Sequence, residues 1–393
     1  METSASSAAP PAAPPGAVAV PGFADGHAHL LKEAAGIAMP AAAAPVRAFH
    51  LRVARERSTP MDVPDPVLPE AGLAGRLLAG LRRAAEAGLV EVTEMGARDW
   101  QYLTALAELQ AGGPLPVRVR VFLASGLAAE ATPAQLAARR AACSGPWVSV
   151  EGVKFYADGW LGPRTCAVCR EFADAPAGGS GQPGESGGVL FLDGPALARR
   201  IAPLAQAGWR IATHAIGDRA VAAVLDGYEL AWDGDLQAMA AARPRIEHAS
   251  LLSAELIARM AATGVTACIQ PSFAVTDAAQ VAAALPPQRR ELAYPWTALA
   301  AAGVTIVAGS DYPIEVLEPL VGLARLIAGR SERGGFGSAG AAPPRSRLDP
   351  AAAFAAMTDA AAGRTWLTAD PRMVTPGGID KIEVTGTEPA PFR

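Results

Sequence analysis

Two histidines separated by one residue, His27 and His29, are the side chains of this sequence best suited to chemistry. Side chains alternate faces along a β-strand, so a strand that ends in His-x-His presents both imidazoles on the same side. Imidazole nitrogens bind zinc and other first-row metals. The chain has five histidines, and His214 and His248 stand in short strand-like runs far downstream. These four predict a metal site, whereas His50 lies in a polar, arginine-rich segment that predicts a solvated loop.

Strands that alternate with helices must position these residues. Apolar runs bounded by turn residues predict eight strands, at residues 23–29, 89–95, 117–123, 147–157, 209–214, 245–248, 265–270 and 304–309. Helical spacing or capping signals predict helices at 71–87, 100–109, 193–208, 219–231, 254–263, 317–328 and 350–362. They also predict a helix that begins at residue 132 and a helical region that ends at residue 299. Eight such units predict an α/β fold with a closed, TIM-like (β/α)8 barrel.

The barrel would bring the candidate residues to one place, because catalytic groups of such barrels lie at the C-terminal ends of the strands. The candidates there are His27 and His29 (strand 1), Lys154 (strand 4), His214 (strand 5), His248 (strand 6) and Asp311 (after strand 8). Each has an ordinary alternative: a core histidine, or an aspartate that caps a helix. Lys154 stands in an otherwise apolar strand, where a lysine is costly unless it is paired or chemically changed.

The motifs around these residues resemble those of a known family. The matching stretches are residues 21–29, the Lys154 strand with Asp158-Gly159, His214 to Arg219, Arg245 to His248, Gln270 to Ser272 and Gly309 to Pro313. In this order they resemble the metal-dependent amidohydrolase superfamily, and within it the branch of N-substituted formamide deformylase-like amidohydrolases.

The resemblance implies a site with two divalent ions, usually zinc. His27 and His29 would hold the first ion and His214 and His248 the second. Lys154 would be carboxylated and bridge both, and Asp311 would bind the first ion and act as general base. The implied activity is hydrolysis of a non-peptide carbon–nitrogen bond, of amide, N-acyl or formamide type, in a small-molecule substrate by a metal-activated hydroxide.

Other functions remain open on the same fold. A lactonase or phosphotriesterase can share the bridging lysine. Related mononuclear deaminases typically carry a glutamate three residues after the strand-5 histidine, where this chain has Gly217. A catalytically silent relative acting as a binding protein is the alternative from a different class. Tyr156, Trp160 and Arg164, at or just beyond strand 4, are candidate pocket residues, with ordinary loop packing as the alternative.

Composition narrows the class of protein. The 393 residues are 51% hydrophobic and 18% charged, which indicates a globular chain. Net charge is -4, and no basic block is present to bind nucleic acid. No apolar run reaches membrane-spanning length. Four cysteines, with Cys166 and Cys169 as a lone CxxC in a loop, predict no disulfide framework, and we expect a cytoplasmic location.

The chain divides into three expected parts: a low-complexity tail (1–22), the barrel (23–365) and a C-terminal tail (366–393). Proteins of the resembling family normally carry a longer start, which forms a small β-sandwich with the C-terminal tail. We therefore expect either a truncated start or a reduced, incomplete sandwich domain. A strand expected at 381–385 would then leave an open edge that could promote a homodimer.

Overall fold

Eight parallel strands form a barrel in the computed structural model, which describes residues 14–30, 43–56, 58–62, 72–175, 186–333 and 340–393. The barrel strands are β1 (Val18–Ala28), β2 (Leu89–Ala97), β3 (Arg118–Ala124), β4 (Val148–Tyr156), β5 (Arg210–Ala215), β6 (Arg245–His248), β7 (Thr266–Ile269) and β8 (Ile306–Ala308). Each pairs in parallel with the next along the chain. The predicted α/β barrel is confirmed.

The barrel closes where β1 meets the segment that follows β8. The backbone N–H of Asp311 donates to the carbonyl of His27 at 2.7 Å, and the N–H of His29 donates to the carbonyl of Tyr312 at 2.7 Å. Ala28 and Tyr312 form a parallel bridge. These bonds join the first and last barrel segments, so residues almost 300 positions apart share one rim.

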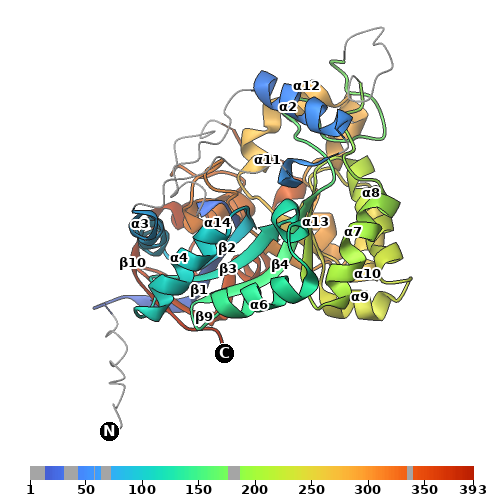
Figure 1. Ribbon diagram of the computed structural model, residues 1–393. Coiled ribbons are helices and arrows are strands. Elements are labelled where there is room, and N and C mark those ends of the chain that lie inside the picture. Colours follow the sequence, from blue (N-terminus) through green and yellow to red (C-terminus); the bar gives the residue numbers. More distant parts are fainter. Residues whose placement is uncertain (1–13, 31–42, 57, 63–71, 176–185, 334–339) are drawn as a thin grey trace.

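Helices lie around the outside of the barrel and over one of its ends (Figure 1). They are α2 (Ala43–Arg55), α3 (Leu73–Glu86), α4 (Trp100–Ala111), α5 (Ser125–Ala129), α6 (Pro133–Cys143), α7 (Gly194–Gln206), α8 (Asp218–Ala231), α9 (Leu236–Ala242), α10 (Ala254–Thr263), α11 (Phe273–Thr276), α12 (Ala278–Ala284), α13 (Trp296–Ala301), α14 (Pro319–Ala328) and α15 (Pro350–Ala356). A capping box begins the helix predicted from 132 onward: Thr132 Oγ1 accepts from the Gln135 N–H, and the Gln135 side chain accepts from the Thr132 N–H.

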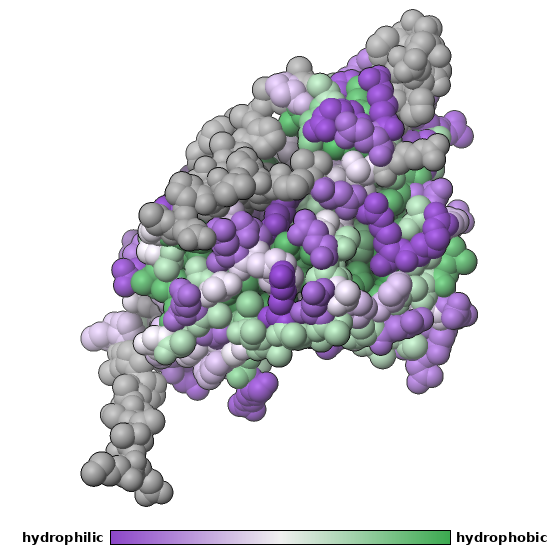
Figure 2. Space-filling view, viewed as in Figure 1, coloured by the Kyte–Doolittle hydropathy of each residue, from purple (hydrophilic) through white to green (hydrophobic). Residues whose placement is uncertain are grey.

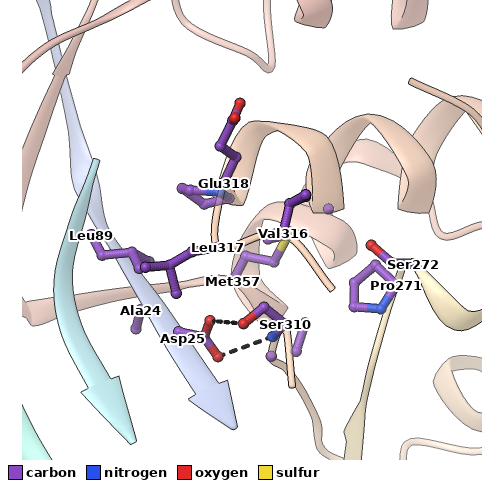
Figure 3. A pocket seen from close by; sticks show the side chains of 14 residues that line it. Ala24, Asp25, Leu89, Pro271, Ser272, Ser310, Val316, Leu317, Glu318 and Met357 are labelled. Carbon is purple, nitrogen blue, oxygen red and sulfur yellow. Dashed lines mark hydrogen bonds between the residues drawn. The ribbon is translucent and has the colours of Figure 1, made fainter. Parts of the chain in front are cut away.

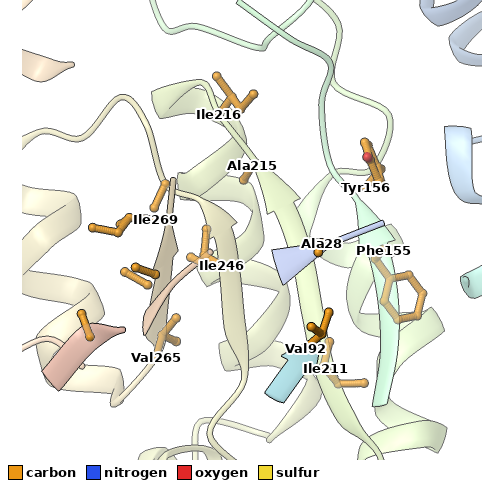
Figure 4. Close-up of a cluster of buried hydrophobic side chains, with 14 of the residues drawn as sticks. Ala28, Val92, Phe155, Tyr156, Ile211, Ala215, Ile216, Ile246, Val265 and Ile269 are labelled. Atoms are coloured by element: carbon orange, nitrogen blue, oxygen red, sulfur yellow. The ribbon is translucent and has the colours of Figure 1, made fainter. Parts of the chain in front are cut away.

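The core follows the strand pattern. Ile211 of β5, Ile246 of β6 and Val265 just before β7 are among the buried apolar side chains of Figure 4. Strands covered on both faces carry continuous apolar runs, as parallel sheets require. Each apolar side chain of this size that is fully buried contributes about 1.5–3 kcal/mol.

The predicted helix at 350–362 is wrong in its second half. Helix α15 ends at Ala356, and β9 (Thr358–Leu367) follows it. The outer half of β1 needs a partner, and β9 supplies one, with Val18 opposite Leu367 and Val20 opposite Thr365. Gly363 has a φ of 129°, which no helix allows. Strand pairing therefore overrides the helix propensity of the alanines.

The two ends of the chain extend the sheet. Strand β1 begins at Val18, inside the stretch predicted to be a tail, while residues 1–13 lie outside the described residues. Strand β10 (Val384–Pro389) pairs antiparallel with β9, so the strand expected at 381–385 begins later than predicted and is not unpaired. The division into a tail, a barrel and a C-terminal part stays a prediction.

The prediction that His50 is a solvated loop residue is wrong. His50 lies in α2 with 2% of its surface exposed. Its Nδ1 is 2.8 Å from Thr165 Oγ1, and its ring packs edge-on against Trp160 and Phe191. Arg47 of the same helix donates to the carbonyl of Pro163, so α2 is attached to the loop after β4.

The surface and the cysteines complete the description. Hydrophilic residues gather over α2 on the face shown in Figure 2. None of the described helices is long and apolar enough to cross a membrane. All four cysteines are free thiols: Cys169 is exposed and Cys166 is buried.

We expect His50 to make the stability of the protein depend on pH. Burial lowers the pKa of His50 from 6.5 to about 4. Between these values the unfolded chain binds a proton that the folded chain does not, so the free energy of unfolding falls as the pH is lowered through this window. At about 1.4 kcal/mol per pH unit, the loss is about 3 kcal/mol. Urea unfolding at several pH values measures the free energy of unfolding. This free energy should depend less steeply on pH in His50→Gln than in the parent. Equal slopes would contradict the prediction.

Candidate metal centre

All six predicted site residues lie at one end of the barrel and are buried. They come from five different strands or strand ends: His27 is in β1 and His29 follows it, Lys154 is in β4, His214 in β5, His248 ends β6, and Asp311 follows β8. This is the C-terminal mouth of the barrel, as the parallel order of the strands requires.

Asp311 joins the two histidines of the His-x-His pair. Its Oδ1 lies 3.2 Å from His29 Nε2 and 3.4 Å from His27 Nε2. The backbone of Asp311 is left-handed, with a φ of 58°. A non-glycine residue in this region is uncommon and is concentrated at functional sites. The bonds across the barrel seam hold it there.

The other two histidines face the same centre. The ring centroids of His214 and His248 are 4.4 Å apart, and those of His27 and His248 are 5.1 Å apart. Ligand atoms of His27, His248 and Asp311 all lie within 4.8 Å of one another, which is close enough for one ion. The structure thus brings together both predicted pairs.

Lys154 is the one lysine of the set, and its Nζ is buried without a hydrogen-bond partner. The atom lies 5.3 Å from the centroid of the Tyr156 ring. Burial lowers the pKa of Lys154 to about 8, although Glu247 and Asp311 act in the opposite direction. The charge of this lysine in turn acts on His27, His214 and His248, so it faces the same centre.

His27, His248 and His214 each have a hydrogen-bond partner at one ring nitrogen. His27 Nδ1 lies 2.6 Å from Glu247 Oε2, His248 Nδ1 lies 2.8 Å from Gln270 Oε1, and His214 Nε2 lies 3.0 Å from the carbonyl of Gly159. Sequence reasoning missed the roles of Glu247 and Gln270, although both stand in the motifs that carry the resemblance. Such partners fix the orientation of a metal-binding imidazole.

Backbone geometry explains how Glu247 and its neighbour His248 both reach the centre. Consecutive residues of a regular strand point to opposite faces. His248 has a φ of 75°, and Ala249 has a φ of 44°. This left-handed turn at the end of β6 changes the direction of the His248 side chain, so it reaches the centre that His27 shares with Glu247.

Asp158, just beyond β4, organises the loops around His214. Its carboxylate accepts from the backbone N–H groups of Ile216 (3.0 Å), Gly217 (2.8 Å) and Ala167 (2.8 Å). A Cβ at Gly217 would lie 1.9 Å from the carbonyl oxygen of Ala167. No glutamate fits at this position, which removes the residue on which the deaminase alternative depends.

The three candidate pocket residues differ in what they contact. Tyr156 stacks on His214 with ring centroids 4.2 Å apart. Trp160 packs against His50 instead, and Arg164 pairs with Asp174 and donates to Gln280 of α12. Only Tyr156 therefore contacts the predicted ligand set.

Electrostatics set the protonation states of Asp311, His248 and His214. Burial alone would raise the pKa of Asp311, but His27 and His29 hold it well below its usual range. Burial lowers the pKa of His248 to about 3 and that of His214 well below its usual value. Both imidazoles are therefore neutral at pH 7, and Asp311 is ionised, as metal ligands must be.

The residues fit a metal. His27 Nε2, His214 Nδ1 and Lys154 Nζ are all buried and make no hydrogen bond in the described structure. A buried polar atom without a partner costs about 1–3 kcal/mol, so three of them at one place call for a group that binds them all. Imidazole nitrogens with a carboxylate are donors that zinc accepts.

A small cavity lies beside the centre, between β1, β8 and the start of α14 (Figure 3). It encloses about 20 Å³, which is room for about one water molecule. Asp25 lies on its wall, where Oδ2 accepts from Ser310 Oγ at 2.5 Å and Oδ1 accepts from the N–H groups of Ser310 and His27, both at 3.0 Å. Asp25 thereby fixes the segment that carries Asp311.

Histidines, a lysine and an aspartate thus meet at the strand ends of a barrel, in an arrangement that fits a metal ion. The sequence profile of the amidohydrolase family matches residues 55–370, which is most of the chain. This chain belongs to the amidohydrolase family.

Individual relatives agree with this assignment. The Bacillus subtilis (strain 168) protein YtcJ, named as a candidate amidohydrolase, is 32% identical over 188 residues, which are 48% of this chain and 33% of that protein. The chain thus matches about a third of the length of this relative.

Solved structures share the fold. An uncharacterised metal-dependent hydrolase from Pyrococcus furiosus is similar over 91% of this chain and 88% of its own, with a TM-score of 0.64 and 19% identity. The atrazine chlorohydrolase TrzN of Arthrobacter aurescens TC1, in a complex with zinc and atraton, is also similar. The similarity covers 96% of this chain and 85% of the TrzN chain, with a TM-score of 0.50 and 16% identity.

We expect Asp25 to contribute more to the free energy of unfolding than its partner Ser310 does. Asp25→Ala would leave three donors without an acceptor, at a cost of about 2–4 kcal/mol. Ser310→Ala removes one donor to Asp25 and the acceptor of the Tyr312 N–H, and costs about 1–2 kcal/mol. Urea unfolding of both variants at pH 8 measures the difference. Equal losses would show that the carboxylate does not hold the segment after β8.

Proposed function

We propose that this protein is a metal-dependent hydrolase that cleaves a non-peptide carbon–nitrogen bond, of amide, N-acyl or formamide type, in a small molecule. The observation that carries the proposal is a set of three buried nitrogens that make no hydrogen bond at the barrel mouth, beside Asp311: His27 Nε2, His214 Nδ1 and Lys154 Nζ. Membership of the amidohydrolase family supports it. The formamide deformylase-like branch is part of the proposal.

The proposed ligands fall into two groups. His27, His29 and Asp311 would hold one zinc ion, His214 and His248 a second, and a carboxylated Lys154 would bridge the two. Carboxylation turns a cationic amine into an anionic oxygen ligand, which removes the cost of a buried lysine without a partner. When bound, two such ions would lower the pKa of a water and polarise the substrate carbonyl.

In the proposed reaction, a side chain of this protein transfers the proton of the attacking water. Asp311 is ionised at neutral pH, and its Oδ1 faces both His27 and His29, so it can accept a proton from the attacking water and deliver it to the leaving nitrogen. Burial raises the pKa of Tyr156 above its usual range, so its hydroxyl stays protonated while its ring stacks on His214. Tyr156 thereby holds the His214 ring in place.

The metal content of the purified protein tests the site. We expect about two equivalents of zinc in the parent after reconstitution with zinc and bicarbonate, and a clear loss in Lys154→Ala, because the bridging ligand is gone. Elemental mass spectrometry measures both. Lys381→Ala, on the C-terminal segment, is the matched control and should keep the parent content. One equivalent that is unchanged in Lys154→Ala would favour mononuclear chemistry, and no metal would contradict the proposal.

The role of Asp311 is tested by kinetics. A panel of N-acyl, formamide and carbamate compounds, with lactones and phosphotriesters as the competing classes, identifies a substrate. With that substrate, Asp311→Asn should lower kcat by about 10²–10⁴-fold, the range of a lost general acid–base group.

The pH–rate profile of the variant should also lose the limb that belongs to the base. Zinc content is measured in parallel, because Asp311 is a proposed ligand as well. A variant with full zinc content and unchanged kcat would remove Asp311 from the proton path. Preferred turnover of lactones or phosphotriesters would replace the proposed bond class.

A further inference from the structure

Below the proposed ligands lies a buried group of charges that the mechanism above does not use. Glu247 is fully buried, and its Oε2 is 2.6 Å from Nδ1 of His27. Arg245, also buried, donates from Nε to Oε1 at 2.7 Å and from Nη2 to Oε2 at 3.0 Å. Nη2 of Arg245 also donates to the carbonyl of Gly26 at 2.7 Å.

The arginine fixes the charge state of the carboxylate. Both oxygens of Glu247 accept from one guanidinium, and such paired, charge-assisted bonds favour the ionised form. An ionised carboxylate has acceptors only. Nδ1 of His27 therefore carries the hydrogen of the 2.6 Å bond.

The consequence concerns the other nitrogen of the ring. With the hydrogen on Nδ1 and held by Glu247, Nε2 of His27 is directed at Asp311 and the centre, and its lone pair is the one available to an ion. We propose that Glu247, supported by Arg245, is a positioning residue that fixes the tautomer and orientation of His27 for metal binding. That an ion binds there rests on the proposed function, whereas the hydrogen bond does not.

Glu247 has a competing role that the geometry also allows. Ligand atoms of His27, Glu247 and Cys268 lie within 4.8 Å of one another and could in principle hold an ion of their own. Against this, the Glu247 oxygens already accept from Arg245 and from His27. A cation placed among these atoms would have to displace an arginine.

The first test reads the ring nitrogens directly. The chain has five histidines, so a long-range ¹H–¹⁵N spectrum of protein labelled in histidine contains five rings, and a His27→Gln sample assigns His27. We expect Nδ1 of His27 to be protonated both without metal and after titration with zinc chloride, while Nε2 responds to zinc. An unprotonated Nδ1 in the metal-free parent would overturn the inference, whatever the zinc result.

The second test measures zinc affinity. Glu247→Gln keeps the shape of the side chain but removes the charge, and it should weaken zinc binding by about 10–100-fold while the number of ions bound stays the same. Glu151→Gln is the matched control. Glu151 is a carboxylate that also pairs with two arginines inside the barrel, Arg120 and Arg210, but it contacts none of the proposed ligands. The control should lose thermal stability without losing zinc affinity.

The outcomes separate the inference from the proposed function. Loss of one whole equivalent of zinc in Glu247→Gln would make Glu247 a ligand and overturn the positioning role, as would a zinc affinity within twofold of the parent. A parent that binds no zinc but has a protonated, hydrogen-bonded Nδ1 would refute the proposed function and leave the His27–Glu247 pair confirmed. The spectrum of the parent decides the point even where Glu247→Gln does not fold.

Discussion

The seam between β1 and the segment after β8 is the constraint on which the candidate site depends. Two backbone bonds of 2.7 Å join Asp311 to His27 and His29 to Tyr312, and the Asp25 carboxylate holds Ser310 beside them. Without this closure the sheet would be open, and Asp311 would lie far from the His-x-His pair. Barrel closure thus does two things at once: it removes the open edge of a parallel sheet, and it brings a carboxylate to the histidines.

Charges inside the barrel form a continuous chain below the site. His27 is bonded to Glu247 and Glu247 to Arg245, whose guanidinium lies 5.4 Å from the centre of the Phe122 ring. Arg210 also lies near that ring, 5.7 Å from its centre; it pairs with Glu151, which pairs with Arg120, and Arg120 pairs with Glu91. Each of these charges has a partner of opposite sign, because a buried charge without a partner is strongly destabilising. The barrel interior therefore contains paired charges as well as apolar side chains, and the candidate site lies at one end of this group of charges.

The sequence could predict the barrel and the convergence of the six candidate residues at its mouth, because both depend on local signals: strand and helix periods, and polar residues at strand ends. It could not predict the burial of His50, because that depends on Thr165, Trp160 and Phe191, which are more than 100 residues away. Strand β9 was missed for the same reason, since its alanines favour a helix until β1 offers its edge. Glu247 stood in a recognised motif, but alternation along a strand placed it opposite His248. Only the left-handed backbone at His248 lets both residues reach the centre.

The partners of the histidines make the two halves of the centre unequal. His27 is bonded to a carboxylate that is itself ionised, His248 to the neutral amide of Gln270, and His214 to a backbone carbonyl. A carboxylate partner raises the basicity of an imidazole more than a neutral acceptor does, because it stabilises positive charge on the ring. In the proposed two-ion site, the group of His27, His29 and Asp311 would therefore have the stronger donors and a carboxylate. The group of His214 and His248 would have neutral donors, so its hold on an ion would depend on the proposed carboxylation of Lys154.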